Sequence, residues 1–309
     1  MRTEVREIVE YPEFIILGAQ KAGTTALYRY LRQHPDVFMP EVKEPGFFAF
    51  ADDPLDYRNA EGNPASIRSY TVTDAEAYER LFEDGNEKTT GEATTLYLHS
   101  EEAVSHIQRH VPHAKLVAVL RHPVDRAYSA YMHAVRKGQE PIDNFEKALD
   151  AEHRRIRDGW GFMWRYETLS RYAGPVRRYL EAFDREQVRI YLFEEFVESP
   201  SAVVKDVYDF IGCDPGFEPN TDVQYNASGV PKRRWLEQFL GQQHTAKEIL
   251  KPLMPESIRK RVAVWLRNRN LEKPGLSSDA RQRLTRRFED DIYELQALLD
   301  RDLGHWLPN

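Results

Sequence analysis

The sequence predicts an α/β protein: a P-loop-like, three-layer α/β/α domain with a central parallel sheet and a helical C-terminal part. Two observations predict this class. Runs dominated by apolar residues at 14–17, 115–120 and 188–193 are typical of strands buried on both faces of a parallel sheet. Segments with helical spacing of apolar residues follow these runs, and such strand–helix alternation is typical of a doubly wound sheet.

Composition and charge narrow the class of protein. The chain has 309 residues, 41% of them hydrophobic, which is enough for a substantial core. Its net charge of −7 gives no global attraction for nucleic acid, so local clusters have to hold any anionic ligand. Cys213 is the only cysteine, which excludes an intrachain disulfide. We expect a cytoplasmic protein, because the N-terminus lacks a signal peptide's apolar core and no run approaches a membrane span.

The first strand leads into a glycine-rich loop at 18–25 and then into a helix. Backbone N–H groups of such a loop, together with the helix dipole, favour a bound phosphate or sulfate. A triphosphate P-loop carries its lysine directly after the second glycine, where this chain has Thr24; here the lysine, Lys21, lies inside the loop. The loop therefore predicts an anion cradle for a different nucleotide. Its candidate ligands are Gln20, Lys21, Ala22, Gly23, Thr24 and Thr25.

The next elements are mostly loops and short helices. A turn and a short extended piece are expected at 34–40, and Glu44 precedes a proline, which favours an extended or loop conformation. A surface loop is expected at 51–66, and a helix over 74–82 with Thr73 or Asp74 as its cap. The segment 89–98, which contains Glu92 among several hydroxyl residues, is interpreted as a second loop, and 101–110 as a helix.

The strand at 115–120 ends in Arg121, and a helix carrying Ser129 follows. Ligands of open α/β sheets bind at the carboxyl ends of the strands, so Lys21 and Arg121 are expected to share one crevice. The remaining expectations are a helical insertion at 136–175, the strand at 188–193, and a series of further helices. These helices are expected at 172–183, 200–211, 235–251, 255–267 and 278–300.

These motifs resemble those of the sulfotransferases that use 3′-phosphoadenosine 5′-phosphosulfate (PAPS). The loop at 18–25 is similar to the family's phosphosulfate-binding loop, and 120–131 resembles its 3′-phosphate site. The resemblance implies that Arg121 and Ser129 bind that phosphate. The stretches 191–196 and 210–212 resemble a further signature, chiefly structural. Residues 226–234 resemble the basic loop that closes over the nucleotide, with Lys232, Arg233 and Arg234 as candidate contacts.

The segment 43–48 points to one branch of that family. It resembles the K-E-x-x-F-F segment of heparan-sulfate-type and related bacterial sulfotransferases, in which the glutamate is the catalytic base. This implies Glu44 as the base, with Glu92 in reserve, although Gly46 departs from the larger residue often found there. The aryl and steroid branch uses a histidine, so His99 and His122 stay open as alternatives.

The resemblance implies an enzyme of one domain over 1–309, with a nucleotide-binding core at about 12–212 and a closing basic loop and C-terminal helices at about 213–309. Lys21 would stabilise the leaving group of PAPS, whose product is 3′-phosphoadenosine 5′-phosphate (PAP), and no metal is implied. The acceptor would be a small or carrier-bound hydroxyl compound: a sugar, lipid, steroid-like or polyketide hydroxyl. A P-loop kinase or other nucleoside triphosphatase and a non-catalytic nucleotide-binding module are the alternatives.

Overall fold

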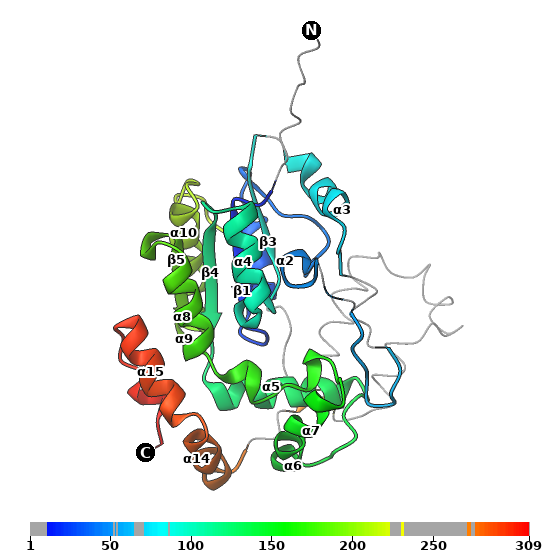
Figure 1. Ribbon diagram of the computed structural model, residues 1–309. Coiled ribbons are helices and arrows are strands. Elements are labelled where there is room, and N and C mark those ends of the chain that lie inside the picture. Colours follow the sequence, from blue (N-terminus) through cyan, green and yellow to red (C-terminus); the bar gives the residue numbers. More distant parts are fainter. Residues whose placement is uncertain are drawn as a thin grey trace, which may run out of the picture.

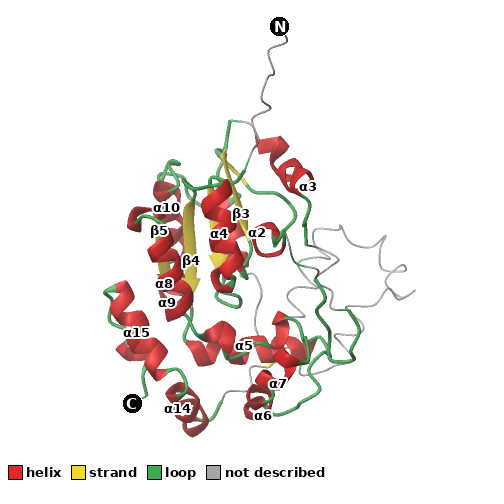
Figure 2. Cartoon of the chain, viewed as in Figure 1, coloured by secondary structure: helices red, strands yellow, loops and turns green. Residues whose placement is uncertain are grey.

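The chain folds around a five-stranded, all-parallel sheet with the strand order β2-β3-β1-β4-β5 (Figures 1 and 2). The computed structural model describes residues 11–51, 53, 55–64, 71–85, 87–222, 230–231, 271–272 and 276–308. The strands are β1 (Phe14–Gly18), β2 (Val37–Phe38), β3 (Thr89–Ala93), β4 (Lys115–Leu120) and β5 (Val188–Leu192). The predicted central parallel sheet is confirmed.

β1 is the central strand of the sheet, and every residue in it is buried, as its apolar sequence predicts. Phe14 lies opposite Gly91 of β3, and Ile15 lies opposite Leu116 of β4. A Cβ atom at Gly91 would lie 2.2 Å from the Phe14 ring, so this position accepts only glycine at the observed strand spacing. Because the strands are parallel, the carboxyl end of β1 lies between the carboxyl ends of its neighbours β3 and β4.

Helices pack on the two faces of the sheet. α4 (Glu101–His110) contacts α2 (Phe47–Phe50) and α8 (Ala173–Ala182) and crosses in front of the sheet in Figure 1. α1 (Thr24–Leu31) packs against α10 (Pro200–Phe210). The helices expected at 101–110, 172–183 and 200–211 are confirmed to within one residue at each end. The remaining α-helices of the described residues are α3 (Ala75–Glu79), α5 (Pro123–Arg136), α6 (Phe145–Asp150), α7 (Glu152–Arg157), α9 (Phe193–Glu198), α14 (Ser278–Arg286) and α15 (Glu289–Leu299).

A short antiparallel pair, β6 (Val230–Pro231) and β7 (Leu271–Glu272), lies apart from the main sheet. The helices expected at 235–251 and 255–267 lie outside the described residues. Within the part of the chain that the structure describes, none of the helices has the length and apolar character needed to cross a membrane.

Three sequence expectations are wrong in detail. The segment 89–98 is not all loop, since Thr89–Ala93 forms β3. This strand has no apolar run; the carboxylate of its buried Glu92 is satisfied by hydroxyl donors from Tyr78, Thr94 and Tyr97. The helix expected at 74–82 ends at Glu79 and continues as a 3₁₀ turn, although Asp74 does cap it by accepting the Ala77 N–H at 2.8 Å.

The long helix expected at 278–300 is also wrong, because it is divided into α14 and α15. The chain turns at Phe288, whose ring is only 1% exposed, and the N–H of Phe288 bonds to the carbonyl of Thr285 at 2.9 Å. The helix is thus interrupted at the residue whose ring is buried in the core.

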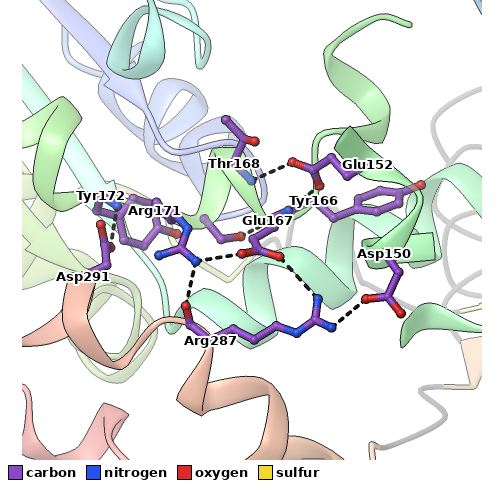
Figure 3. Close-up of polar contacts among 10 residues, drawn as sticks. Asp150, Glu152, Tyr166, Glu167, Thr168, Arg171, Tyr172, Arg287 and Asp291 are labelled. Atoms are coloured by element: carbon purple, nitrogen blue, oxygen red, sulfur yellow. Dashed lines mark hydrogen bonds and ion pairs between the residues drawn. The ribbon is translucent and has the colours of Figure 1, made fainter. Parts of the chain in front are cut away.

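The C-terminal helices dock by ion pairs and helix capping. Arg281 of α14 makes a two-pronged contact with Asp125 in the first turn of α5, at 2.6 and 2.9 Å. Figure 3 shows the second contact area, where Arg287 reaches both Asp150 and Glu167. The carboxylate of Asp291 accepts two N–H groups at the start of α8, from Tyr172 at 2.8 Å and Ala173 at 3.1 Å.

Replacing Asp291 with alanine is expected to lower the free energy of unfolding by about 1–3 kcal/mol, because two buried N–H groups lose their acceptor. Urea denaturation followed by circular dichroism measures the change. Asp290→Ala is the matched control, since Asp290 is exposed on the same helix. Equal stability of the two variants would contradict this capping role.

Candidate functional site

The loop between β1 and α1 presents unused backbone donors. Ala19 N–H bonds to the Val119 carbonyl at 2.8 Å, which ties the loop to β4. Gly23 has a φ of 89°, and a Cβ atom there would lie 3.1 Å from the Phe196 ring, so glycine is required. Among the described residues no acceptor is found for the N–H groups of Gln20, Lys21, Gly23, Thr24 and Thr25. Such free donors suit a bound anion, and the anion cradle stays a prediction.

The side chain of Lys21 carries a positive charge that no described carboxylate neutralises by an ion pair. Burial lowers the pKa of Lys21 to about 8, and four further cations act in the same direction. They are Arg136, Arg121, Arg126 and Lys137. Bringing so many like charges together is costly without an anion, so this region of the molecule is suited to a ligand with several negative charges.

Arg121 lies directly against the loop. Its Nη1 donates to the carbonyl oxygen of Lys21 at 3.0 Å, and its guanidinium lies over the ring of Phe193, 4.6 Å from the centroid. The expected proximity of Lys21 and Arg121 is confirmed by this contact. Phe193 begins α9 immediately after β5, so the ends of β1, β4 and β5 meet here.

Ser129 supplies a second unused group on α5. It is 6% exposed, and its Oγ has no hydrogen-bond partner among the described residues. A buried hydroxyl without a partner costs free energy, so native proteins rarely leave one unsatisfied. A ligand oxygen would satisfy it, which fits the predicted phosphate contact.

The sequence reasoning missed further residues on α5. Burial, followed by the charges of Lys21, Lys137 and Arg136, lowers the pKa of His133 to about 3, so its imidazole is neutral beside the loop lysine. Arg136 Nη2 lies 3.0 Å from His133 Nδ1. The spacing of Ser129, His133 and Arg136 puts all three on one helix face, and this is the signal that could have found them.

Glu44 is held in place by Thr95 on the other side of the site. Its Oε2 accepts from Thr95 Oγ1 at 2.8 Å and from Thr95 N at 3.3 Å, while Lys43 Nζ lies 3.2 Å from Oε1. The expected loop conformation is confirmed, but Glu44 is not extended: its φ is 60°. The two contacts with Thr95 hold its carboxylate in spite of this unfavoured backbone angle.

Glu92 is completely buried and serves as an anchor. Its carboxylate accepts from the hydroxyls of Tyr78 and Tyr97, both at 2.7 Å, and from Thr94 Oγ1 at 2.8 Å. Thr94 Oγ1 in turn accepts the N–H of Gly46 at 3.1 Å, and the Tyr97 hydroxyl accepts the N–H of Phe48 at 3.2 Å. Glu92 thus fixes the segment that follows Glu44, and it does not line the cavity beside Glu44.

The two candidate histidines contact the backbone. His99 Nε2 lies 3.2 Å from the carbonyl oxygen of Arg171, and burial lowers the pKa of His99 to about 3. His122 caps α5 by accepting the Val124 N–H at 3.2 Å, and burial lowers its pKa to about 4. Neither histidine lines the cavity beside Glu44.

A cavity of about 220 Å³ lies between the loop and Glu44. Gln20 contributes from the loop side, Glu44 from the opposite side, and Gln139 and Trp164 from the segment after α5. The other lining residues are Gly46, Phe50, Asn59, Pro64, Thr71, Thr94, Leu96, Gly161, Phe162 and Met163. Trp164 is one of the lining residues and Trp160 is not, although their ring centroids lie 5.1 Å apart.

The expectations about the basic loop and about the absence of a metal stay untested. Lys232, Arg233 and Arg234 lie outside the described residues. In the ranges that the structure does describe, no three His, Cys, Asp or Glu side chains are grouped so that they could hold a metal ion.

Known proteins resemble this chain over most of its length. A family model described as "Sulfotransferase family" matches residues 12–219, more than half of the chain. The crystal structure of a sulfotransferase from Alicyclobacillus acidocaldarius has a TM-score of 0.74 and 34% sequence identity, and the match covers 96% of this chain and 99% of that one.

Curated relatives include bifunctional heparan sulfate N-deacetylase/N-sulfotransferases. Number 4 of Mus musculus is 26% identical, and the match covers 96% of this chain and 31% of that protein. Number 3 of Homo sapiens matches to the same extent. The chain thus spans about a third of the length of these curated relatives. A mouse sulfotransferase crystallised with PAP is more remote, at 18% identity and a TM-score of 0.41 over 66% of this chain and 59% of that one.

The pH dependence of stability should reveal Glu92. Burial raises the pKa of its carboxyl from 4.5 to about 7, so the folded protein binds more protons than the unfolded chain between these values. The free energy of unfolding is therefore expected to fall as the pH rises through this range. Relative to Glu92→Gln, the wild type should lose up to about 3 kcal/mol.

Urea denaturation at a series of pH values measures this difference. Glu76→Gln is the control, since the Glu76 side chain is 83% exposed, and its profile should follow the wild type. Parallel profiles for the wild type and Glu92→Gln would show that the buried carboxyl does not titrate in this range.

Proposed function

The chain belongs to the sulfotransferase family, and we propose that it moves a sulfuryl group from PAPS to a hydroxyl group of an acceptor by in-line displacement. The observation that carries the proposal is the positive charge of Lys21, which lies among Arg121, Arg126, Arg136 and Lys137 without a described carboxylate paired to it. PAPS bears a phosphosulfate and a separate 3′-phosphate, so it supplies negative charge at two places.

The residues present fit this donor. The unused N–H groups of the loop, with Thr24 and Thr25, would hold the phosphosulfate. Arg121 would make a two-pronged contact with the 3′-phosphate, and the unpartnered hydroxyl of Ser129 would donate to it. When bound, the donor provides the sulfuryl group, and PAP departs.

Lys21 and Glu44 would act on opposite sides of the transfer. Negative charge develops on the leaving oxygen, and the preorganised ammonium group of Lys21 would stabilise it. The acceptor hydroxyl loses its proton during attack, and Glu44 would take that proton as general base. Thr95 would orient the carboxylate through the two hydrogen bonds described above. Glu92 would support this arrangement from behind rather than act as the base.

Calorimetric titration with PAP in the absence of added metal tests the donor, and transfer of labelled sulfate from PAPS to an acceptor panel tests the reaction. We expect PAP to bind and MgATP not to compete with it. Tight binding of MgATP with no binding of PAP would replace the proposal by a kinase or triphosphatase. Binding of PAP without transfer to any acceptor would favour a non-catalytic nucleotide-binding module.

Arg121→Ala is expected to weaken PAP binding by at least about tenfold, because a charge-assisted contact with the 3′-phosphate is lost. The dissociation constant from calorimetry measures the effect. Arg109→Ala, at an exposed arginine of α4, is the matched control. Unchanged PAP affinity together with slower turnover would be inconsistent with a phosphate contact.

Glu44→Gln is expected to lower kcat by at least about tenfold while PAP affinity stays within about twofold, because the amide cannot accept the proton. Steady-state kinetics at saturating PAPS measure kcat. The control is Glu41→Gln, in the same segment, where the side chain is 85% exposed. Wild-type turnover in Glu44→Gln would move the role of base to another residue.

A further inference from the structure

The cavity beside Glu44 has an unusual charge balance for a relative of heparan sulfate N-sulfotransferases. Glu44 is the only ionisable side chain among its described lining residues. Lys21, Arg121 and the other cations of the donor side are absent from that lining. The cation next to Glu44 is Lys43, which is paired with it at 3.2 Å between Nζ and Oε1 and does not itself line the cavity. A carboxylate or sulfate on an acceptor would therefore compete with Glu44 for this cation and meet no cation among the described lining residues.

Apart from Glu44, the polar side chains that line the cavity are neutral. Gln20, Asn59, Thr71 and Thr94 contribute amide and hydroxyl groups. Gln139 also lines it, and its Oε1 is buried without a hydrogen-bond donor among the described residues. An amide oxygen only accepts hydrogen bonds, so it would be satisfied by a hydroxyl and repelled by an anion.

The rest of the wall is apolar and rigidly held. The rings of Phe50 and Phe162 pack edge to face with their centroids 5.8 Å apart. Trp164 is 3% exposed, and its Nε1 donates to the carbonyl oxygen of Gln139 at 3.0 Å, which fixes the indole beside the unpartnered amide. Such a wall accommodates the apolar face of a ring.

A second hollow adjoins the first across Phe50, Leu96 and Phe162, which line both. It carries the carboxylates of Asp53, Glu101 and Glu102 and, as its one described arginine or lysine, Arg165. An acceptor that extends beyond the first cavity would therefore again meet more negative than positive charge. This arrangement does not suit a polyanionic glycan.

We infer that the acceptor is an uncharged alcohol with an apolar face toward Phe162 and Trp164 and a second hydroxyl that donates to Gln139. The inference rests on the proposed function and adds the acceptor's chemical class.

Matched pairs of acceptors test the charge. The probes are phenyl β-D-glucoside against phenyl β-D-glucuronide, and benzene-1,4-dimethanol against 4-(hydroxymethyl)benzoate, with a heparan sulfate oligosaccharide as the polyanion. In each pair a carboxylate replaces one hydroxymethyl group, so one member is neutral and the other is anionic, and both keep a hydroxyl that can react. We expect kcat/KM of the neutral member, at saturating PAPS, to exceed that of its anionic partner by at least about tenfold in one pair or both.

Equal or better use of the anionic members, or preference for the heparan sulfate oligosaccharide, would overturn the inference. So would failure of every neutral probe in a protein that binds PAP and transfers sulfate to an anionic acceptor. A protein that does not bind PAP in the parallel titration fails the proposed function itself, so the two failures are distinguishable.

Variants of Gln139 supply a second test. Gln139→Leu should lower kcat/KM for the neutral probes by at least about fivefold with PAP affinity unchanged. Gln108→Leu, the same change at an exposed position of α4, should have no effect. Gln139→Lys should raise the relative use of the anionic partner by at least about tenfold, which a merely structural role would not produce. An unaltered ratio in Gln139→Lys would overturn the placement of the second hydroxyl.

Discussion

The buried carboxylate of Glu92 is the interaction on which the acceptor side of the molecule depends. It gathers three hydroxyl donors from Tyr78, Thr94 and Tyr97 inside the core. Two of these hydroxyls, those of Thr94 and Tyr97, also accept hydrogen bonds from the backbone N–H groups of Gly46 and Phe48. A buried carboxylate tolerates few alternative arrangements, because each lost hydrogen bond leaves a polar group unsatisfied. The segment that carries Glu44 is therefore joined to β3 with little freedom.

The site divides into two halves of opposite character. The donor half contains Lys21, with Arg121, Arg126, Arg136 and Lys137 as the cations that act on it. No described carboxylate forms an ion pair with Lys21. The acceptor half contains one carboxylate, neutral amides and aromatic rings. Gln20 belongs to both, since it follows Ala19 in the loop and lines the cavity. Transfer between an anionic donor and a neutral alcohol would take place at this boundary.

Local pattern was sufficient for the donor half. The loop with its displaced lysine, the arginine after β4 and the serine on α5 follow strands whose apolar runs are easily recognised, and parallel strands bring their ends together. His133 was missed because a single histidine on an amphipathic helix has no distinguishing feature until Lys21 is placed beside it. β3 was missed because it has no apolar run. Its burial depends on hydrogen bonds of its polar side chains, those of Thr90 with Tyr11 and of Glu92 with Tyr78, Thr94 and Tyr97.

Short contiguous motifs were enough to predict the parallel sheet, the glycine-rich loop and the family resemblance. They also supplied the candidates Lys21, Glu44, Arg121 and Ser129. Three-dimensional contacts, by contrast, are needed to distinguish the surroundings of Glu44 from those of Glu92. Both are glutamates near hydroxyl residues in the sequence, but one lines a cavity and the other is saturated by hydrogen bonds in the core. The neutral character of the cavity was likewise decided by tertiary structure, since its walls come from segments far apart in the chain whose contacts no local pattern records.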